Sequence, residues 1–244
     1  MRRSWCRMAA LATGFALILA APAFAATRPV VVELFTSQGC SSCPPADALL
    51  RELARRPDII ALGYHIDYWN GLGWKDPLST PEATARQRAY ARRFDNGQIY
   101  TPQMIVDGTR EMVGSDRAAV LAAIGDGTRP AAAPVQFAAD HGRVTIGAGS
   151  GNGTVRLVRF VRHRTTRVGA GENAHRTAED ADGVESITRL GEWHGAARDF
   201  TIAPPAAGHG VAVLVQAPDG RMLGAGAVET PATDATLQRP IPRA

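Results

Sequence analysis

Hydrophobic residues follow two different patterns along the chain, and the change between them falls close to residue 130. Between residues 30 and 124, short apolar runs alternate with segments in which apolar residues recur every three or four positions. Between residues 134 and 230, short apolar stretches are separated by glycine-rich turns. A short apolar run is typical of a buried strand, and the three-to-four spacing is typical of an amphipathic helix. The pattern therefore predicts an alternating strand–helix region followed by an all-β region.

The strand–helix region opens with an apolar run over residues 30–35, which predicts a strand buried on both faces. Leu49, Leu50 and Leu53 then recur at helical spacing. Residues 59–66 form a second apolar run. These segments predict a strand, a helix and a second strand.

Capping and turn signals predict the elements that follow. Residues 79–82 combine a Ser or Thr cap with a proline in the first turn and a glutamate at the capping-box position, so a helix is predicted to begin there. Asn96-Gly97 is the predicted stop of this helix. An apolar run over residues 104–106, the turn dipeptide Asp107-Gly108 and a return run over residues 111–113 predict a hairpin.

A last helix of this region is predicted after Ser115 and Asp116, which act as its cap, and it carries Val120, Leu121 and Ile124. The predicted order is β-α-β-α-β-β-α, which is the order of the thioredoxin core. A Cys-x-x-Cys motif stands where the first strand passes to the first helix.

The all-β region gives shorter signals. Residues 155–161 predict a strand whose phase slips once, as at a β-bulge. Residues 211–215 are apolar at every position, as in the core of a β-sandwich. The segment Pro-Ala-Ala-Ala-Pro over residues 130–134 predicts a linker between the two regions.

The N-terminus has the pattern of a targeting segment. Three arginines precede an uncharged apolar run over residues 9–21, and Ala23-Phe24-Ala25 matches the small-x-small rule of signal peptidase. We expect a cleavable signal peptide, cut after Ala25, rather than a membrane anchor, because the apolar run is short for a span. The mature protein is therefore expected in the periplasm or secreted, without membrane association.

These patterns together predict an α/β thioredoxin-like N-terminal domain and a C-terminal all-β, sandwich-like domain. The predicted divisions are a signal peptide (1–25), a thioredoxin-like domain (26–129), a linker (130–134), a β-sandwich-like domain (135–230) and a loose tail (231–244).

Composition and charge narrow the possible functions. Hydrophobic residues make up 45% of the 244 residues and charged residues 20%, which is typical of a globular protein. The formal net charge is +4, and removal of the three arginines of the signal leaves +1. A nearly neutral mature chain gives no support to nucleic-acid binding. The glycines over residues 147–153 precede a predicted strand and not a helix, so they do not fit a dinucleotide loop, and no cofactor is expected.

Cys40 and Cys43 are the cysteines that remain once the signal, which contains Cys6, is removed. A disulfide between them closes a very small loop, which constrains the unfolded chain little. At a helix N-terminus, backbone N–H groups and the helix dipole favour the thiolate, which is the nucleophile of disulfide exchange. Cys40 is expected to attack and Cys43 to resolve the mixed disulfide. The expected partners are protein or small-molecule thiols and disulfides.

Five segments around and after these cysteines form a specific signature: residues 35–47, 64–69, 72–77, 86–90 and 100–103. They resemble the DUF1223 family, a group of secreted bacterial proteins with a thioredoxin-like domain. The resemblance covers most of the mature chain. It implies a thioredoxin-like fold and redox chemistry, and it names no substrate.

Two further site residues follow from the resemblance, and a third is a candidate. Thr101-Pro102 resembles the cis-proline site that lies against the Cys-x-x-Cys of thioredoxin-like proteins, where a cis bond opens a backbone edge for a peptide. The alternative is a trans proline at a strand start. Glu33 lies in the first strand, where thioredoxins hold a buried carboxylate that takes the proton of the resolving cysteine. Its alternative is a carboxylate at the sheet edge.

The sequence departs from thioredoxin around the motif. Gly39 replaces a tryptophan, and Ser41 and Ser42 replace a Gly-Pro spacer. Pro44 and Pro45 each disfavour helical geometry in the preceding residue, so the helix is expected to begin late or to be kinked. The serine hydroxyls could instead hydrogen-bond the sulfur.

Two other functions remain open. The first is a non-catalytic secreted binding module with a structural disulfide. The second is a metal-handling protein that uses Cys40, Cys43 and His65, although zinc prefers four ligands and no second matched pair exists. His65 and Asp67 share one face of the second strand by their spacing.

Three further segments have features that suggest a place near the motif or on the surface. Tyr68, Trp69 and Trp74 could form an aromatic wall near the sulfurs. The arginines over residues 156–167 are expected to form a solvated or salt-bridged face, with Glu179, Asp180, Asp182 and Glu185 as partners. Residues 171–176 also resemble a family segment, and one hypothesis places them as a loop over the Cys-x-x-Cys.

Overall fold

The computed structural model describes residues 26–94, 97–125 and 127–232. The predicted signal peptide and nearly all of the predicted tail lie outside these residues. The helices are α1 (Pro44–Leu53), α2 (Pro81–Ala91), α3 (Arg117–Ile124) and the 3-10 helix η1 (Asn70–Leu72). The strands of the first region are β1 (Thr27–Thr36), β2 (Ile59–His65), β3 (Gln103–Val106), β4 (Arg110–Val113) and β5 (Thr128–Pro130). The later strands are β6 (Val135–Phe137), β7 (Arg143–Ile146), β8 (Gly153–Arg167), β9 (Thr177–Trp193), β10 (Arg198–Thr201), β11 (His209–Gln216) and β12 (Met222–Glu229).

The predicted element order of the first region is confirmed. Up to α3 the chain runs β1-α1-β2-α2-β3-β4-α3, with η1 between β2 and α2. Thr80 and Asp116 accept hydrogen bonds from Ala83 N and Ala119 N, so both predicted caps are formed. The helix α2 ends at Ala91, earlier than predicted, and the predicted stop at Asn96 lies outside the described residues.

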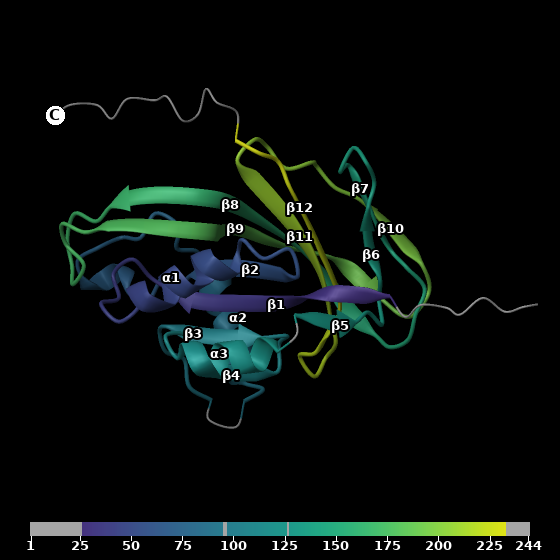
Figure 1. Cartoon of the computed structure of the whole chain (residues 1–244), viewed down its shortest axis with the longest axis horizontal. Helices are drawn as coiled ribbons and strands as arrows, with labels where there is room; N and C mark the ends of the chain where they lie inside the picture. Colours follow the sequence, from purple (N-terminus) through teal and green to yellow (C-terminus); the bar gives the residue numbers. More distant parts are fainter. Residues whose placement is uncertain (1–25, 95–96, 126, 233–244) are drawn as a thin grey trace, which may run out of the picture.

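One large mixed sheet contains strands from both regions of the chain. Its strand order is β12-β11-β8-β9-β2-β1-β3-β4, with β5 paired to β1, and Figure 1 shows the long β8–β9 hairpin beside β2. The strands β6, β7 and β10 form a second, three-stranded sheet. The prediction of a separate C-terminal β-sandwich is therefore not confirmed, because β8, β9, β11 and β12 extend the sheet of the first region.

The junction between the two regions depends on glycine. The strand β2 pairs with β9 in parallel through Gly63 and Gly183. A Cβ at Gly63 would lie 3.3 Å from the carbonyl oxygen of Ala181, so the missing side chain lets the two backbones approach closely. The hydrophobic pattern of β2 predicts a buried strand, but it does not predict that β9 is the neighbouring strand.

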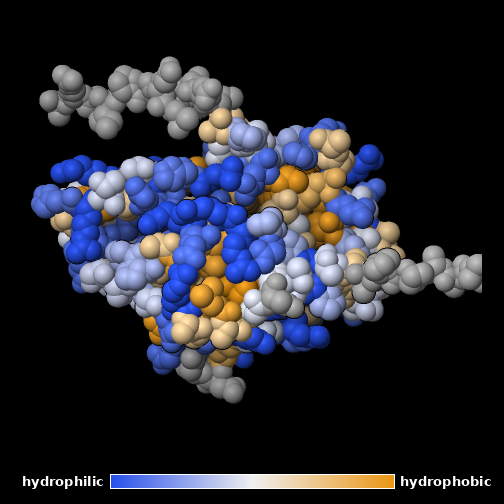
Figure 2. All heavy atoms as spheres, viewed as in Figure 1, coloured by the Kyte–Doolittle hydropathy of each residue, from blue (hydrophilic) through white to orange (hydrophobic). Residues whose placement is uncertain are grey.

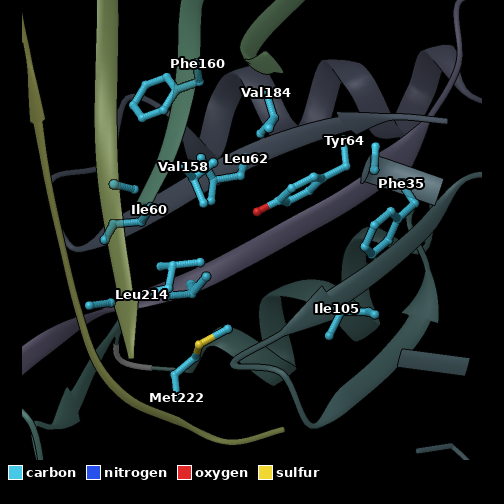
Figure 3. Packing of buried hydrophobic residues seen from close by; sticks show 14 of the residues in the cluster. Phe35, Ile60, Leu62, Tyr64, Ile105, Val158, Phe160, Val184, Leu214 and Met222 are labelled. Carbon is cyan, nitrogen blue, oxygen red and sulfur yellow. The ribbon is translucent and has the colours of Figure 1, made fainter. Parts of the chain in front are cut away.

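The large sheet is buried on both faces near β1. Val30, Val32 and Leu34 pack on one face against α1 and α3. Val31 and Phe35 pack on the other face, against residues of β2, α2, β8 and β11. Figure 3 shows this second cluster, with Tyr64, Leu62, Val158 and Leu214 between the strands.

The surface is mainly polar. Figure 2 shows hydrophilic residues over most of one face, with smaller hydrophobic patches near its middle and at the β-rich end. In the part of the chain that the structure describes, helices of the length and hydrophobicity needed to cross a membrane are absent.

Candidate thiol–disulfide site

Cys40 and Cys43 form a disulfide in the turn between β1 and α1. Cys43 is the N-cap residue of α1. The turn is closed by hydrogen bonds from Cys40 N to Ser37 O at 3.1 Å and from Cys43 N to Cys40 O at 3.2 Å. Both cysteines have 0% of their surface exposed, whereas Ser41 and Ser42 between them are exposed.

The two prolines after the motif neither delay nor displace the helix. The helix α1 begins at Pro44, directly after Cys43, so the expectation of a late start is wrong. Proline fits the first helical turn because its missing N–H has no partner there in any helix. The consequence is chemical: Pro44 and Pro45 offer no amide donors to a nearby thiolate.

A serine hydroxyl lies where those donors are missing. Ser42 Oγ is 3.3 Å from Cys40 Sγ and donates to Thr101 O at 3.4 Å. Its single proton can serve one of these acceptors at a time. Ser42 therefore links the first sulfur to the Thr101-Pro102 segment.

The Thr101–Pro102 peptide bond is cis, as predicted. Trp69 Nε1 donates to Thr101 Oγ1 at 2.9 Å, which places Trp69 beside this segment. The structure thus brings together four of the five predicted site residues: Cys40, Cys43, Thr101 and Pro102.

Glu33 lies apart from the disulfide. It is fully buried on the face of β1 that carries Val31 and Phe35, opposite the face packed by α1. Arg86 Nε and Nη2 donate to its two carboxylate oxygens at 2.5 and 2.9 Å, and the Tyr90 hydroxyl donates to it as well. Because β1 lies between β2 and β3, Glu33 is not at a sheet edge either. None of the hydrogen bonds or ion pairs of the described residues joins Glu33 to a cysteine.

Glu33, Arg86, Tyr90 and Gln216 form what we call the Glu33 cluster. Gln216 Nε2 donates to the Tyr90 hydroxyl at 2.9 Å, and Gln216 Oε1 is 3.5 Å from Arg86 Nη1. The cluster joins β1, α2 and β11, which come from both regions of the chain. A bidentate arginine satisfies both oxygens of the carboxylate.

Asp47 is a second carboxylate near the motif, and its sequence context predicts no role for it. It stands four residues after Cys43 on α1, and Thr36 Oγ1 donates to its Oδ1 at 2.7 Å. Removal from bulk water raises the pKa of Asp47 to about 7, against the opposing effects of the Thr36 hydrogen bond and the charge of His65. An aspartate in the first turn of a helix is common for its interaction with the dipole alone, so the sequence held no distinctive signal.

His65 occupies the centre of a buried charged cluster beneath the Cys40 loop. His65 Nδ1 is 2.7 Å from Asp76 Oδ2, and His65 Nε2 is 3.7 Å from Asp180 Oδ1. Gln38 donates a hydrogen bond to each carboxylate. Its backbone N–H donates to Asp76 and its side-chain amide donates to Asp180, each at 2.7 Å. We call His65, Asp76, Asp180 and the neighbouring Asp47 the His65 cluster.

The acids of the His65 cluster hold its histidine in the charged form. Burial alone would lower the pKa of His65, but the charges of Asp76, Asp180 and Asp47, with the Asp76 hydrogen bond, raise it to about 9. Burial raises the pKa of Asp180, whereas the His65 charge and the hydrogen bonds it accepts lower that of Asp76 despite burial. The loop that carries Cys40 therefore rests on an imidazolium paired with carboxylates.

Asp180 was expected to pair with the arginines of residues 156–167, and that expectation is wrong. Its side chain is 5% exposed and faces His65 and Gln38. Among those arginines, Arg162 of β8 pairs with Glu229 of β12 at 2.7 Å. The alternation of β9 alone does not say which of its two faces meets β2 and the Cys40 loop.

The tip of the β8–β9 hairpin covers the Cys40 loop. Asn173 Nδ2 donates to Gln38 O at 3.0 Å and to Cys40 O at 2.8 Å. Glu172 accepts a hydrogen bond from Ser41 N at 3.1 Å. The hypothesis that residues 171–176 lie over the Cys-x-x-Cys is therefore confirmed.

A cavity of about 150 Å³ lies between α1, the start of β9 and the loop residues Ser37 and Gln38 that precede Cys40. Its walls include Asp47, Arg51, Asn173 and Asp180, and it reaches Pro44, the residue after Cys43. The cavity gives the carboxylate of Asp47 a route towards solvent.

A metal-binding arrangement is not found in the described part of the chain: none of its groups of three or more His, Cys, Asp and Glu side chains is placed to hold an ion. The expectation that His65 and Asp67 share a face of the second strand is wrong, because β2 ends at His65. Asp67 lies beyond the strand and accepts a hydrogen bond from Thr84 Oγ1 at 2.6 Å.

Fold and site together define a mixed α/β protein with a covered disulfide at a strand-to-helix junction. The chain belongs to the DUF1223 family, a family described as proteins of unknown function, whose model matches residues 31–216. A search of the curated proteins found no match.

Two solved structures are similar. A protein from Agrobacterium tumefaciens has 34% sequence identity, with 84% of this chain and 96% of that chain covered and a TM-score of 0.67. HBP35 of Porphyromonas gingivalis has 18% identity, with 89% of this chain and 80% of that chain covered and a TM-score of 0.51. The second likeness concerns the fold alone.

Proposed function

We propose that this protein exchanges electrons with thiols and disulfides through Cys40 and Cys43. The observation that carries the proposal is a disulfide whose second sulfur belongs to the N-cap residue of α1, with Ser42 joining the first sulfur to Thr101. A helix N-terminus and a hydroxyl donor both favour a thiolate over a thiol. A thioredoxin-like unit over residues 26–129 is part of the same proposal.

The exchange proceeds through a mixed disulfide. A partner thiolate attacks Cys40 Sγ, the Cys40–Cys43 bond breaks, and Cys43 leaves as a thiolate that takes up a proton. A second partner thiolate then attacks the mixed disulfide and releases Cys40 as a thiolate. Two electrons have passed from the partner dithiol to the Cys40–Cys43 disulfide, which is now a dithiol. The reverse sequence reduces a partner disulfide.

We assign Asp47, in place of Glu33, as the group that accepts the proton of Cys43 and returns it. It lies one helical turn from Cys43 on α1, and residues four apart on a helix share a face. Its pKa of about 7 suits a group that takes and returns a proton near neutrality. Glu33 is already bound by Arg86 and Tyr90.

The first experiment is a glutathione redox titration of the purified protein, read by alkylation and mass. A potential between about −120 and −270 mV places the pair among exchanging dithiols. A Cys43→Ala variant is the control, and it should trap a stable mixed disulfide with glutathione at Cys40.

A second candidate function has its own observation. Both cysteines are completely covered, which also fits a structural disulfide in a binding module. A potential below about −300 mV would support that alternative and contradict the exchange function. We propose the periplasm or the exterior of the cell as the compartment, where protein and small-molecule thiols are the expected partners.

A further inference from the structure

Residues 168–176, at the tip of the β8–β9 hairpin, form a compact unit that we call the cap. Val168 N donates to Arg176 O and His175 N donates to Val168 O, both at 2.9 Å. Ala174 N donates to Gly171 O at 3.1 Å. Because these bonds lie within the cap, it can move as one piece without losing them.

The cap is fastened to the Cys40 loop by three polar contacts. Two come from Asn173, whose side chain is 4% exposed and bonds Gln38 O and Cys40 O. The third is the hydrogen bond from Ser41 N to Glu172, which is itself exposed. In Figure 1 the hairpin tip lies at the end of the molecule where β1 ends and α1 begins.

The underside of the cap rests on the ring of Trp74 and buries one aliphatic side chain, Val168, which is 1% exposed. Trp74 lies against the cap, and a Cβ at Gly169 would come within 3.2 Å of its ring. Trp74 Nε1 donates to Gln38 Oε1 at 3.2 Å, so the same tryptophan also contacts the loop before Cys40. Small residues such as Gly169 and Gly171 let the cap approach the ring closely. Val168 is the one apolar side chain of the cap that is fully buried, so little apolar area holds the cap shut.

We propose that the cap is a gate for the dithiol, latched by Asn173 and Glu172, and that the Cys40 sulfur reacts with a partner only when the latch opens. The proposal rests on the exchange function and names how access to that site is controlled. Cys40 is fully covered while its neighbour Ser41 is exposed, so the covering is local.

The latch also indicates what opens it. Asn173 supplies a donor to Cys40 O, and Glu172 supplies an acceptor to Ser41 N. An extended peptide backbone presents one donor and one acceptor per residue, so it can replace both contacts as it binds. The fitting partner is an extended peptide segment that carries a cysteine, and folded protein surfaces are kept away from the sulfurs.

The test is the rate at which dithiothreitol reduces the disulfide, followed by quenching with N-ethylmaleimide and mass measurement. We expect the rate to rise about tenfold in Asn173→Ala, which loses two hydrogen bonds, and about threefold in Glu172→Gln, which weakens one. Trp74 emission should shift in the same variants, because the ring loses part of its cover.

Matched controls are Asn152→Ala and Glu185→Gln, two substitutions outside the cap, and both should keep the wild-type rate. Glu172→Gln changes an exposed side chain, so it stays informative if Asn173→Ala unfolds. Unchanged rates in Asn173→Ala and Glu172→Gln would overturn the gate, as would an equal rise in the controls. Dithiothreitol needs no natural partner, so these results are independent of whether the redox titration supports exchange.

Discussion

Two carboxylates lie on opposite faces of the large sheet, Glu33 fully buried and Asp47 half-buried, and their surroundings differ. Glu33 is held by a bidentate arginine and a tyrosine, on a face that joins three elements of the fold. Asp47 is held by one threonine hydroxyl beside a cavity. Arg86 places a compensating charge directly on Glu33, whereas Asp47 has a neutral hydroxyl donor, and removal from bulk water raises its pKa to about 7. Removal from water therefore makes an acid available for proton transfer only where no neighbouring cation fully compensates its charge.

The largest effect is expected from breaking the Glu33 cluster. Arg86→Met leaves a buried carboxylate without its partner, which costs about 3–5 kcal/mol in the free energy of unfolding. Urea unfolding measures this loss. The double variant Glu33→Gln/Arg86→Met removes both charges and should recover part of the stability. A loss below about 1 kcal/mol in Arg86→Met would contradict a structural role for the pair.

The His65 cluster predicts a pH dependence of stability. The pKa of His65 is raised from 6.5 to about 9, so the folded state binds a proton that the unfolded state releases in this window. Its contribution is fully present below pH 6.5 and is lost as pH rises through 9. We expect the free energy of unfolding to fall by about 1–3 kcal/mol across that interval.

Asp76→Asn sharpens that prediction. It removes the carboxylate closest to His65, so the pKa of His65 should fall and the loss of stability between pH 6.5 and 9 should flatten. Urea midpoints at several pH values measure the slope. An unchanged slope would show that another group titrates there.

Asp47→Asn separates the two carboxylates in function. We expect exchange with glutathione disulfide at pH 7 to slow about tenfold, because Cys43 loses its proton acceptor. The bend near pH 7 in the rate profile should disappear with it. The variant should fold at least as well as the parent, since it removes an acid whose charged form is disfavoured by burial. If the profile keeps its bend, Asp47 is not the proton acceptor.

Ser42→Ala should give the smallest effect. It removes the hydroxyl at 3.3 Å from Cys40 Sγ, and a single exposed donor changes thiolate stability modestly. We expect the Cys40 alkylation rate of the reduced protein to fall about threefold at pH 7. Ser41→Ala, which removes the neighbouring exposed hydroxyl, is the matched control and should leave the rate unchanged.

Local signals were sufficient for much of the fold. The capping residues Thr80 and Asp116 and the Asp107-Gly108 turn predicted their elements because each acts within a few residues. The apolar run of β1 predicted a strand buried on both faces. The error came with the second region, because a strand buried in a sandwich and one inside a larger sheet have the same hydrophobic pattern.

The site divides in the same way. The spacing of Cys40 and Cys43 predicted the disulfide-forming pair, because it is a property of neighbouring residues, and the resemblance to thioredoxin-like proteins predicted the cis bond at Thr101-Pro102. Long-range packing brings Glu33 to Arg86, brings Asp180 and Asn173 to the Cys40 loop, and leaves Asp47 with the Thr36 hydroxyl as its donor. Those contacts join residues up to 142 positions apart, as between Gln38 and Asp180. The contacts of Asp180 and Asn173 depend on how the β8–β9 hairpin packs beside β2, and the contact of Glu33 with Arg86 depends on how α2 packs on β1. A single sequence carries no local signal for either arrangement.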